Sequence, residues 1–340
     1  MFRFFLIGAA AMVFAGASSA NSTDGELISS KPCVRHPISY DQNVAAIRKA
    51  YESEVALASK AGIAQPPVSA FLAVAPTRAE YAALTAHNYS CRSIFYGSDG
   101  LKVAAYIWEP THIPAGAKLP VVVAARGGNR DFGKFMPEAH GTNAALVAAG
   151  FVVIGVQYRG VDGGEGIEQF GGDDVHDVVN AVTLARRLPE ADSRNVFLTG
   201  GSRGGMMVYL AIRDGAKVNA AATISAMTDL GLESKRRPNM ETDVWRELIP
   251  NYDANPEAAL ASRSGVLVAE HVDLPPMLIL HGTADWRVDP RDSFEVAEAL
   301  QARHRPYSLH IFDDDVHGIG LNWRERDRLI IDWFRQHMVR

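Results

Sequence analysis

The pattern of hydrophobic residues changes along the chain, and its first clear period is helical. Between Asp41 and Ala61 apolar residues recur every three or four positions, which predicts an amphipathic helix. The apolar face of this helix is formed by Val44, Ile47, Tyr51, Val55 and Ala58. Further on, Arg92–Tyr96 and Leu101–Trp108 flank the turn Gly97-Ser98-Asp99-Gly100. This arrangement predicts two strands joined by a tight turn.

From Leu119 onward, short continuous apolar runs alternate with helical stretches. The runs are Val121–Ala125, Phe151–Val156, Asn195–Leu198, Ala220–Ile224, Pro276–Leu280 and Tyr307–Phe312. Continuous apolar runs of this length are typical of strands buried on both faces of a parallel sheet. The helical stretches between and after them include Val175–Val182, Phe294–Leu300 and Arg326–Met338. The alternation predicts a doubly wound, mostly parallel α/β sheet.

One segment, from about Leu230 to Leu274, departs from this alternation. It contains several prolines, many charged residues and Trp245. We expect a small helical insertion over the sheet, where a lid would lie. The pattern therefore divides the chain into an N-terminal helical extension, residues 21–90, and a main α/β domain, residues 91–340, which includes the insertion at 230–274.

The first twenty residues have the three parts of a secretory signal peptide. Arg3 provides a positive start, Phe4–Ala17 is an unbroken run of apolar or small residues, and Ser18-Ser19-Ala20 offers small residues at a cleavage position. An uncleaved anchor is the alternative, but the run of 14 residues is shorter than the roughly 20 that span a bilayer. We therefore expect an exported protein, periplasmic or extracellular, with no membrane attachment after cleavage.

Export changes the interpretation of the two cysteines. Cys33 and Cys91 are the only cysteines in the chain, and an even pair in an oxidising compartment favours a disulfide over two buried thiols. The net charge of -5 argues against a nucleic-acid groove. The chain is long enough for a sizeable core, and no pattern in it indicates a metal or an organic cofactor.

The strongest chemical signal is the sequence Gly200-Gly201-Ser202-Arg203-Gly204-Gly205. It contains G-x-S-x-G, it follows a predicted strand, and the helical stretch Met206–Ile212 comes next. Strand, tight turn and helix form the context of a nucleophile elbow, which is typical of the α/β-hydrolase fold. An ordinary glycine-rich turn is the alternative. We interpret Ser202 as a catalytic nucleophile.

A nucleophilic serine needs a base, and the base needs an acid that orients it. In the α/β-hydrolase fold these partners follow the serine in the order Asp, His, each after a later strand. Asp285 follows one predicted strand and His317 follows the next. Asp289 is the rival acid, and the acidic turn at 313–315 is expected to be mostly solvated. The remaining candidate histidines, which are His140, His176, His281 and His304, are interpreted as structural.

A developing oxyanion needs backbone donors on two sides. The amide of Arg203 is the first candidate, because the residue after the nucleophile supplies one donor in this fold. The second is expected from the loop Arg126-Gly127-Gly128-Asn129 after an earlier strand, where Gly127 and Gly128 let the backbone approach a ligand. A plain tight turn is the alternative for these glycines.

At this point the sequence resembles the catalytic domain of prolyl oligopeptidase-type serine peptidases. The resemblance covers roughly Leu101 to Met338. The matching pieces are Tyr158-Arg159-Gly160 with Gly164-Glu165-Gly166, the stretch Asp173–Asp177, the elbow segment Ser193–Gly205, the acid loop His281-Gly282 with Asp285 and Val288, and His317-Gly318. The resemblance implies a serine peptidase that forms an acyl-enzyme and needs no cofactor.

Two features depart from that family's pattern. Its larger members carry a β-propeller, and the region before Arg92 is too short for one. Its oxyanion loop often has a tyrosine before Gly-Gly, where Arg126 stands here, so an amide near Gly128 is expected to replace the hydroxyl donor. Because esterases share this catalytic domain, a carboxylesterase acting on small or sugar-linked acyl esters is the alternative to a peptidase of short peptides. A catalytically silent binding protein of the same fold is a further alternative, which the intact triad argues against.

Overall fold

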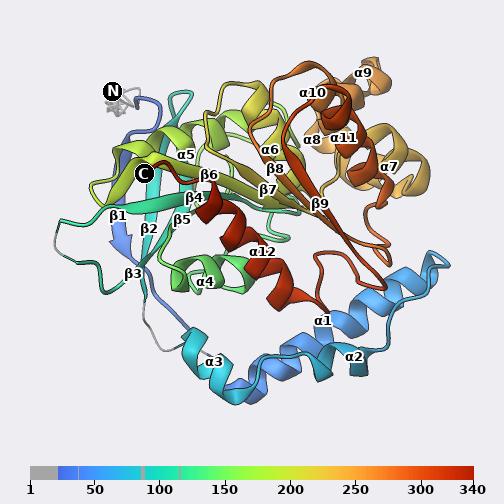
Figure 1. Ribbon diagram of the computed structural model, residues 1–340. Coiled ribbons are helices and arrows are strands. Elements are labelled where there is room, and N and C mark those ends of the chain that lie inside the picture. The colour runs from blue at the N-terminus through green and yellow to red at the C-terminus, as the bar shows by residue number, and fades with distance from the viewer. Residues whose placement is uncertain (1–21, 37, 86–88, 115) are drawn as a thin grey trace, which may run out of the picture.

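A nine-stranded mixed sheet forms the centre of the computed structural model, which describes residues 22–36, 38–85, 89–114 and 116–340 (Figure 1). The strands are β1 (Leu27–Pro32), β2 (Tyr89–Ser98), β3 (Leu101–Pro110), β4 (Leu119–Ala125), β5 (Val152–Val156), β6 (Ala191–Gly201), β7 (Ala221–Ile224), β8 (Met277–Gly282) and β9 (Tyr307–Phe312). Their order is β1-β2-β3-β5-β4-β6-β7-β8-β9. In this order, the pairs β1/β2, β2/β3 and β3/β5 are antiparallel. The remaining pairs, from β5/β4 to β8/β9, are parallel.

Two helical layers cover the faces of the sheet. On one face lie α4 (Gly141–Ala148) and α12 (Trp323–Gln336); on the other lie α5 (Val175–Arg187), α6 (Arg203–Arg213), α10 (Gly265–His271) and α11 (Arg291–Ala302). Strand β4 shows the division: Val121 and Val123 face one layer, while Val122 and Ala124 face the other. Because side chains alternate along a strand, a strand covered on both faces must be apolar at every position. The predicted doubly wound α/β-hydrolase architecture is confirmed.

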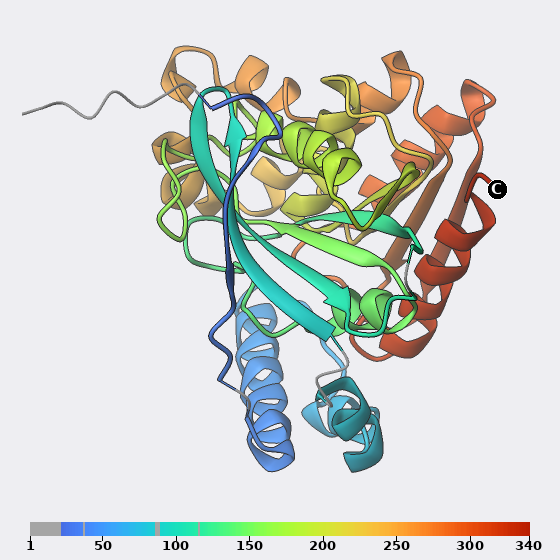
Figure 2. The ribbon, with the colours of Figure 1, turned by 90° about the vertical axis from the view of Figure 1, so that its left-hand side faces the viewer.

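Three further helices project from one end of the sheet (Figure 2). They are α1 (Tyr40–Lys60), α2 (Val68–Ala73) and α3 (Arg78–Thr85). Helix α1 begins at a capping box in which the Ser39 hydroxyl accepts from the Gln42 amide and the Gln42 side chain accepts from the Ser39 amide. Its bounds differ by one residue at each end from the predicted helix. The ring of Tyr51 stacks on Phe71 of α2, with 3.6 Å between centroids.

The N-terminal segment also contributes a strand that the hydrophobic pattern does not predict. Strand β1 pairs with β2 at the sheet edge, and most of its residues are exposed, so it lacks the apolar alternation by which a strand is recognised. Close by, Cys33 and Cys91 form a disulfide, with 5.4 Å between their Cα atoms. The predicted pairing is therefore present, and it closes the loop that contains α1, α2 and α3.

The segment from 230 to 274 is helical. It forms α7 (Leu230–Arg236), a π-helical turn (Glu241–Trp245), α8 (Arg246–Leu248), a 3-10 turn (Tyr252–Ala254), α9 (Pro256–Ala261) and α10. Trp245 anchors it: the side chain is fully buried and its ring meets the edge of Phe170. The insertion is thus packed into the main core rather than attached by a flexible loop.

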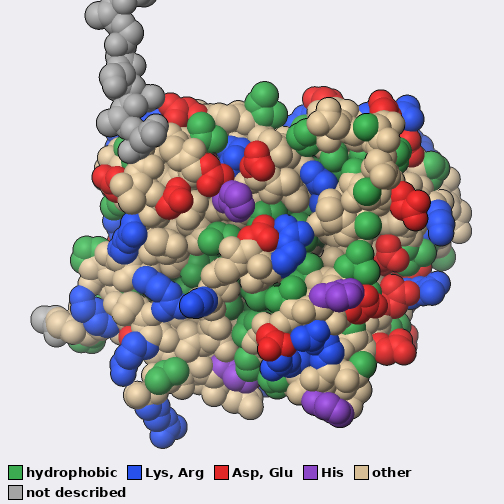
Figure 3. Space-filling model, turned by 90° about the horizontal axis from the view of Figure 1, so that it is seen from above, with side chains coloured by type: hydrophobic (Ala, Val, Ile, Leu, Met, Phe, Trp, Pro, Cys, Tyr) green, Lys and Arg blue, Asp and Glu red, His purple; other side chains and the backbone are tan. Residues whose placement is uncertain are grey.

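The predicted signal peptide, residues 1–20, lies outside the described residues. Among the residues that are described, no helix is both long and apolar enough to cross a membrane. The strands of this part of the chain all belong to one sheet, so the described residues contain no β-propeller. Seen from above, acidic and basic side chains are interspersed over the surface (Figure 3).

Candidate active site

Ser202 lies at a sharp turn between β6 and α6. Its backbone has φ 56° and ψ -126°, a conformation that costs free energy in a residue with a side chain and is typical of a nucleophile elbow. A hydrogen bond to the neighbouring strand β7 stabilises the turn: the Ser202 amide donates to the Ile224 carbonyl over 3.0 Å. Strain of this kind persists only when the surroundings enforce it.

The glycines around Ser202 explain why the turn has its sequence. A methyl group on Gly200 would lie 2.3 Å from the Gly204 carbonyl oxygen, and one on Gly204 would lie 2.1 Å from that of Ala125. Neither distance is compatible with a side chain, so the strand and helix approach this closely only with glycine at both positions. The elbow therefore requires the glycines of the G-x-S-x-G motif, because there is no room for a side chain at either position.

Asp285 and His317 meet beside this turn. The His317 Nδ1 and Asp285 Oδ2 atoms are 2.8 Å apart. Asp285 is fixed from its other side, because its Oδ1 accepts from the amides of Arg287 and Val288 over 2.9 and 3.0 Å. Burial opposes ionisation of Asp285, but the neighbouring His317 and His281 outweigh burial and hold the pKa of Asp285 well below its usual range. The carboxylate is thus charged and oriented toward His317.

The rival acid has another function. Asp289 Oδ1 accepts from the Arg291 amide over 3.0 Å at the start of α11, and its Oδ2 lies 3.4 Å from Arg236 Nε. Among the described residues, Asp289 forms no hydrogen bond or ion pair with His317. Of the two candidate acids, only Asp285 is hydrogen-bonded to the histidine.

His281, which the sequence suggested was merely structural, contacts the carboxylate directly. Its Nε2 lies 3.2 Å from Asp285 Oδ2 and 3.3 Å from the Val288 carbonyl, and its Nδ1 lies 2.6 Å from the Ser293 hydroxyl. The acceptor at Val288 requires a proton on Nε2; in the neutral ring with that proton, the Ser293 hydroxyl donates to Nδ1. The signal that identifies His281 is its spacing, four residues before Asp285 at the end of β8.

The acidic turn before His317 is only partly solvated, which corrects the expectation from the sequence. Asp313 and Asp314 are exposed, but Asp315 is fully buried. Its carboxylate accepts from the amides of Val316, Leu321 and Asn322 over 2.8 to 2.9 Å. Backbone amides in a loop need partners, and one buried carboxylate supplies them here. Asp315 therefore shapes the loop that carries His317.

The glycine loop after β4 faces the elbow, and two buried arginines hold it. Arg126 donates to the carbonyls of Gly127 and Phe132, each over 3.1 Å, and Arg203 Nη1 donates to the Gly128 carbonyl over 2.9 Å. With their carbonyls bound from behind, the loop amides point the other way. Within the described part of the chain the amides of Gly128 and Arg203 make no hydrogen bond, so both remain available as donors.

The charges of these arginines are compensated locally. Glu168 Oε2 lies 2.8 Å from Arg203 Nη1 and 3.3 Å from Arg126 Nη2, and Asp174 Oδ2 lies 2.5 Å from Arg203 Nη2. All four side chains are buried. Buried charges are tolerated when they are paired and hydrogen-bonded. Arg126, which occupies the position of a tyrosine in the resemblance described above, is thus a support of the loop.

A cavity of about 320 Å³ lies above Ser202. Its lining brings together Ser202, His317, Gly127 and Gly128 with Arg237 of the insertion and Glu54 of α1. Glu54 accepts from the Trp286 indole and from Arg287 Nε, each over 2.9 Å. Helix α1 therefore borders the cavity and is clamped to the loop that carries Asp285, a contact between residues 233 positions apart that the sequence does not reveal.

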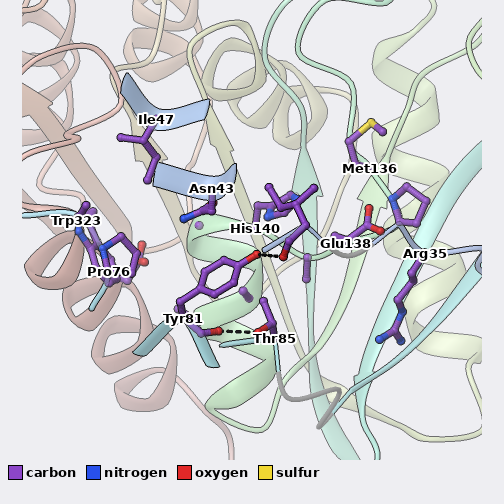
Figure 4. A pocket seen from close by; sticks show the side chains of 18 of the residues that line it. Arg35, Asn43, Ile47, Pro76, Tyr81, Thr85, Met136, Glu138, His140 and Trp323 are labelled. Atoms are coloured by element: carbon purple, nitrogen blue, oxygen red, sulfur yellow. Dashed lines mark hydrogen bonds between the residues drawn. The ribbon is translucent and has the colours of Figure 1, made fainter. Parts of the chain in front are cut away.

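A larger cavity, of about 790 Å³, lies between the N-terminal helices and the main domain. It contains none of Ser202, Asp285 and His317. Figure 4 shows side chains from both parts around it, where the Tyr81 hydroxyl donates to the Ile38 carbonyl over 2.6 Å. Of the two cavities, the smaller one therefore contains the candidate nucleophile and base, Ser202 and His317. Among the described residues no cluster of three or more His, Cys, Asp or Glu side chains is placed to hold a metal ion.

Residues 138–340 match the prolyl oligopeptidase family of peptidases. The chain belongs to this family. Membership makes it a serine hydrolase, and the matched region contains Ser202, Asp285 and His317. The resemblance stated from the motifs is thereby confirmed.

This member of the prolyl oligopeptidase family is similar to known proteins of several kinds, and three of them show the range. The uncharacterized peptidase YtmA of Bacillus subtilis is 27% identical over 226 residues, which are 66% of this chain and 85% of that protein. A probable acetylxylan esterase A of Aspergillus terreus is 26% identical over 223 residues, which are 60% of this chain and 68% of that protein. A Mycobacterium tuberculosis puromycin-hydrolyzing peptidase superposes with a TM-score of 0.64 at 24% identity. That superposition covers 74% of this chain but only 40% of the other.

Proposed function

We propose that this protein is a serine peptidase that cleaves short peptides through an acyl-enzyme, with Ser202, His317 and Asp285 as its triad. One observation carries the proposal. Ser202 is held at a strained elbow in the same cavity as His317, and His317 is hydrogen-bonded to an ionised, buried Asp285. This set of groups supplies a nucleophile, a base and the acid that orients the base.

In the first half of the reaction, His317 Nε2 takes the proton from the Ser202 hydroxyl, whose oxygen bonds to the substrate carbonyl carbon. The amides of Arg203 and of Gly128, with the Gly127–Gly128 loop behind them, stabilise the negative oxygen. Asp285 keeps the proton of neutral His317 on Nδ1 and stabilises the imidazolium. His317 then protonates the leaving nitrogen, and the carbon–nitrogen bond breaks.

In the second half, water replaces the leaving group. His317 removes a proton from the water, the hydroxide oxygen bonds to the acyl carbon, and the ester bond to Ser202 breaks as His317 returns its proton to the serine. No redox step or cofactor enters this cycle. Each group therefore ends in its starting state.

Access to the cavity favours small substrates. Two segments border the cavity of the main domain, residues 91–340. The insertion within that domain, residues 230–274, contributes Arg237, and the N-terminal extension, residues 21–90, contributes Glu54. Both are packed against the core or clamped to the acid loop. A roof of this kind admits a few residues of a peptide and excludes a folded protein.

We also propose that the protein is exported. The pattern of residues 1–20 and the Cys33–Cys91 disulfide support export, because disulfides persist in oxidising compartments. Detection of the mature chain beginning after Ala20 in the periplasm or the medium, by N-terminal sequencing, tests this proposal. Recovery of the chain with its first twenty residues attached would contradict it.

A carboxylesterase is the second candidate. The similarity to a probable acetylxylan esterase supports it, and the same triad cleaves esters. The deciding experiment measures kcat/KM for matched amide and ester substrates that share one acyl group. Amide cleavage supports the peptidase; ester turnover with no amide cleavage across a broad peptide panel would favour the esterase.

The nucleophile is tested with Ser202→Ala. Loss of the hydroxyl should lower kcat by about a million-fold, the magnitude found when a triad member of a serine protease is removed, without unfolding the chain. A fluorophosphonate probe should label the wild-type protein at Ser202 and leave the variant unlabelled. Wild-type rates in the folded variant would refute the assignment.

A further inference from the structure

The helical insertion contributes a cation to the catalytic cavity. Arg237 follows the last residue of α7, and its side chain lines the cavity together with Ser202 and His317. The apolar side chains of the lining are those of Met227, Met240, Phe132 and Phe170. Met227 lies directly beside the nucleophile, because its amide donates to the Ser202 carbonyl over 3.2 Å. A group bound to Arg237 would therefore lie in the same cavity as Ser202.

The other two arginines of the lining have carboxylate partners. Arg287 binds Glu54 through two nitrogens, over 2.5 and 2.9 Å. Arg203 is paired with Glu168 and Asp174. The positive charges of Arg287 and Arg203 are therefore balanced by carboxylates that they contact. Glu54, the carboxylate in the cavity lining, is the partner of Arg287.

Arg237 differs from both. No carboxylate of the described residues lies within 4.0 Å of its guanidinium. Nη1 donates to the Arg287 carbonyl over 3.0 Å, and Nη2 lies 3.3 Å from the Met240 sulfur, a weak acceptor. The guanidinium also lies 5.7 Å from the centroid of the Trp286 ring. Of its five N–H donors, three have no hydrogen-bond acceptor among the described residues.

The charge of Arg237 is permanent and only partly solvated. Burial lowers its pKa, Arg287 and Arg236 add to that effect, and Glu233 and Asp285, which do not contact the guanidinium, oppose it, but a guanidinium stays protonated in proteins. A cation removed from water is stabilised most by an anion that it contacts. Planar guanidinium groups bind carboxylates through two parallel hydrogen bonds. The cavity therefore presents a carboxylate site that the protein itself does not fill.

We propose that Arg237 is a specificity residue that binds a carboxylate of the substrate, so that the enzyme prefers acidic over neutral peptides. This inference rests on the proposed peptidase function and adds the substrate class. The carboxylate comes either from an acidic side chain on the acyl side of the cleaved bond or from the free C-terminus of the leaving group. Both sources have the same chemistry, and two substrate series separate them.

The neighbouring Arg236 is a matched control. It has the same side chain one position earlier, but it pairs with Glu233 over 3.0 Å and with Asp289 over 3.4 Å and does not line the cavity. Arg236→Met should therefore leave charge preference unchanged. Arg237→Met removes the cation while keeping an unbranched side chain, and Arg237→Lys keeps the charge without the planar fork.

The experiment measures kcat/KM for two isosteric pairs of substrates. The first pair is N-acetyl-glutamyl and N-acetyl-glutaminyl p-nitroanilide; the second is N-acetyl-leucyl-leucine and its C-terminal amide. In the wild type the acid of at least one pair should be preferred by about tenfold or more, which corresponds to about 1.4 kcal/mol. In Arg237→Met the ratio should fall to about one, mainly through KM, because the contact binds ground state and transition state alike. Arg237→Lys should retain part of the preference, and Arg236→Met all of it.

Several results would overturn the inference. A wild-type enzyme that cleaves the neutral members of both pairs as well as the acids would remove the preference while leaving the peptidase proposal intact. A preference for the acid that survives in Arg237→Met would show that another residue binds the carboxylate. If no peptide is cleaved, the peptidase proposal fails, and the site is still tested by fluorophosphonate labelling of Ser202. N-acetylglutamate should then slow labelling more than N-acetylglutaminamide, which has no carboxylate, does in the wild type but not in Arg237→Met, and equal protection would refute the carboxylate site.

Discussion

The contact between Asp285 and His317 makes a sharp prediction for Asp285→Asn. The carboxylate has two distinct oxygens: Oδ1 accepts two backbone amides, and Oδ2 faces His317 and His281. In the variant the amide oxygen must stay at the Oδ1 position, because a nitrogen there would face two N–H donors. The amide NH₂ group therefore takes the place of Oδ2.

This exchange reverses the hydrogen bonding of both histidines. Facing an NH₂ group, His317 Nδ1 must become the acceptor, so that the proton moves to Nε2. That tautomer cannot take the proton of Ser202. His281 is also affected, because its Nε2–H, directed at the Val288 carbonyl and Asp285, now meets a donor.

The expected magnitude follows from these two losses. A wrong histidine tautomer in a serine protease triad lowers kcat about 10⁴-fold, which corresponds to about 5.4 kcal/mol of activation free energy. The donor–donor contact at His281 adds an unsatisfied buried group, which costs about 1 to 3 kcal/mol of stability. We therefore expect a folded but less stable protein with about 10⁴-fold lower kcat.

The assay is kcat on a p-nitroanilide substrate, with urea unfolding of the same preparation. Asp289→Asn is the control, because its oxygen can still accept from the Arg291 amide and its partly exposed, 3.4 Å pair with Arg236 contributes about 1 kcal/mol or less. Its kcat should stay within a few-fold of the wild type. Equal losses in the two variants, or the larger loss in Asp289→Asn, would refute the assignment of Asp285.

Two further predictions concern stability. Replacing Cys33 and Cys91 by serine opens a loop with a sequence separation of 58 and should lower the free energy of unfolding by up to about 4 kcal/mol; a urea midpoint unchanged from that of the oxidised wild type would contradict this. Burial raises the pKa of Asp292 to about 8, above about 3.9 in the unfolded chain, so the native state binds more protons and Asp292 makes the protein less stable as the pH rises between these values. Asp292→Asn should remove this dependence in urea unfolding at pH 5 and pH 9, and an unchanged slope would show that Asp292 is not its source.

The chain's local patterns determined most of the fold and pointed to the candidate catalytic groups. Continuous apolar runs predicted the parallel strands, since only strands covered on both faces need to be apolar throughout. Glycines two residues before and two residues after Ser202 mark the elbow, since the close approach there leaves no room for a side chain. Asp285 and His317 followed from the order of strands and loops. The apolar runs and the elbow depend on residues close together in the sequence, and the positions of Asp285 and His317 depend on the order of the strands, so the sequence alone carries them.

The tertiary structure decided what lies around these groups. It placed His281 against Asp285, buried Asp315 beneath the His317 loop, and brought Glu54 to Arg287 across 233 positions. It also left Arg237 without a carboxylate partner while pairing Arg236 next to it. Charged residues adjacent in the sequence look alike there, because their burial and pairing depend on the direction in which distant segments pack. Only the assembled chain therefore distinguishes a charge that the protein compensates from one that remains for a ligand.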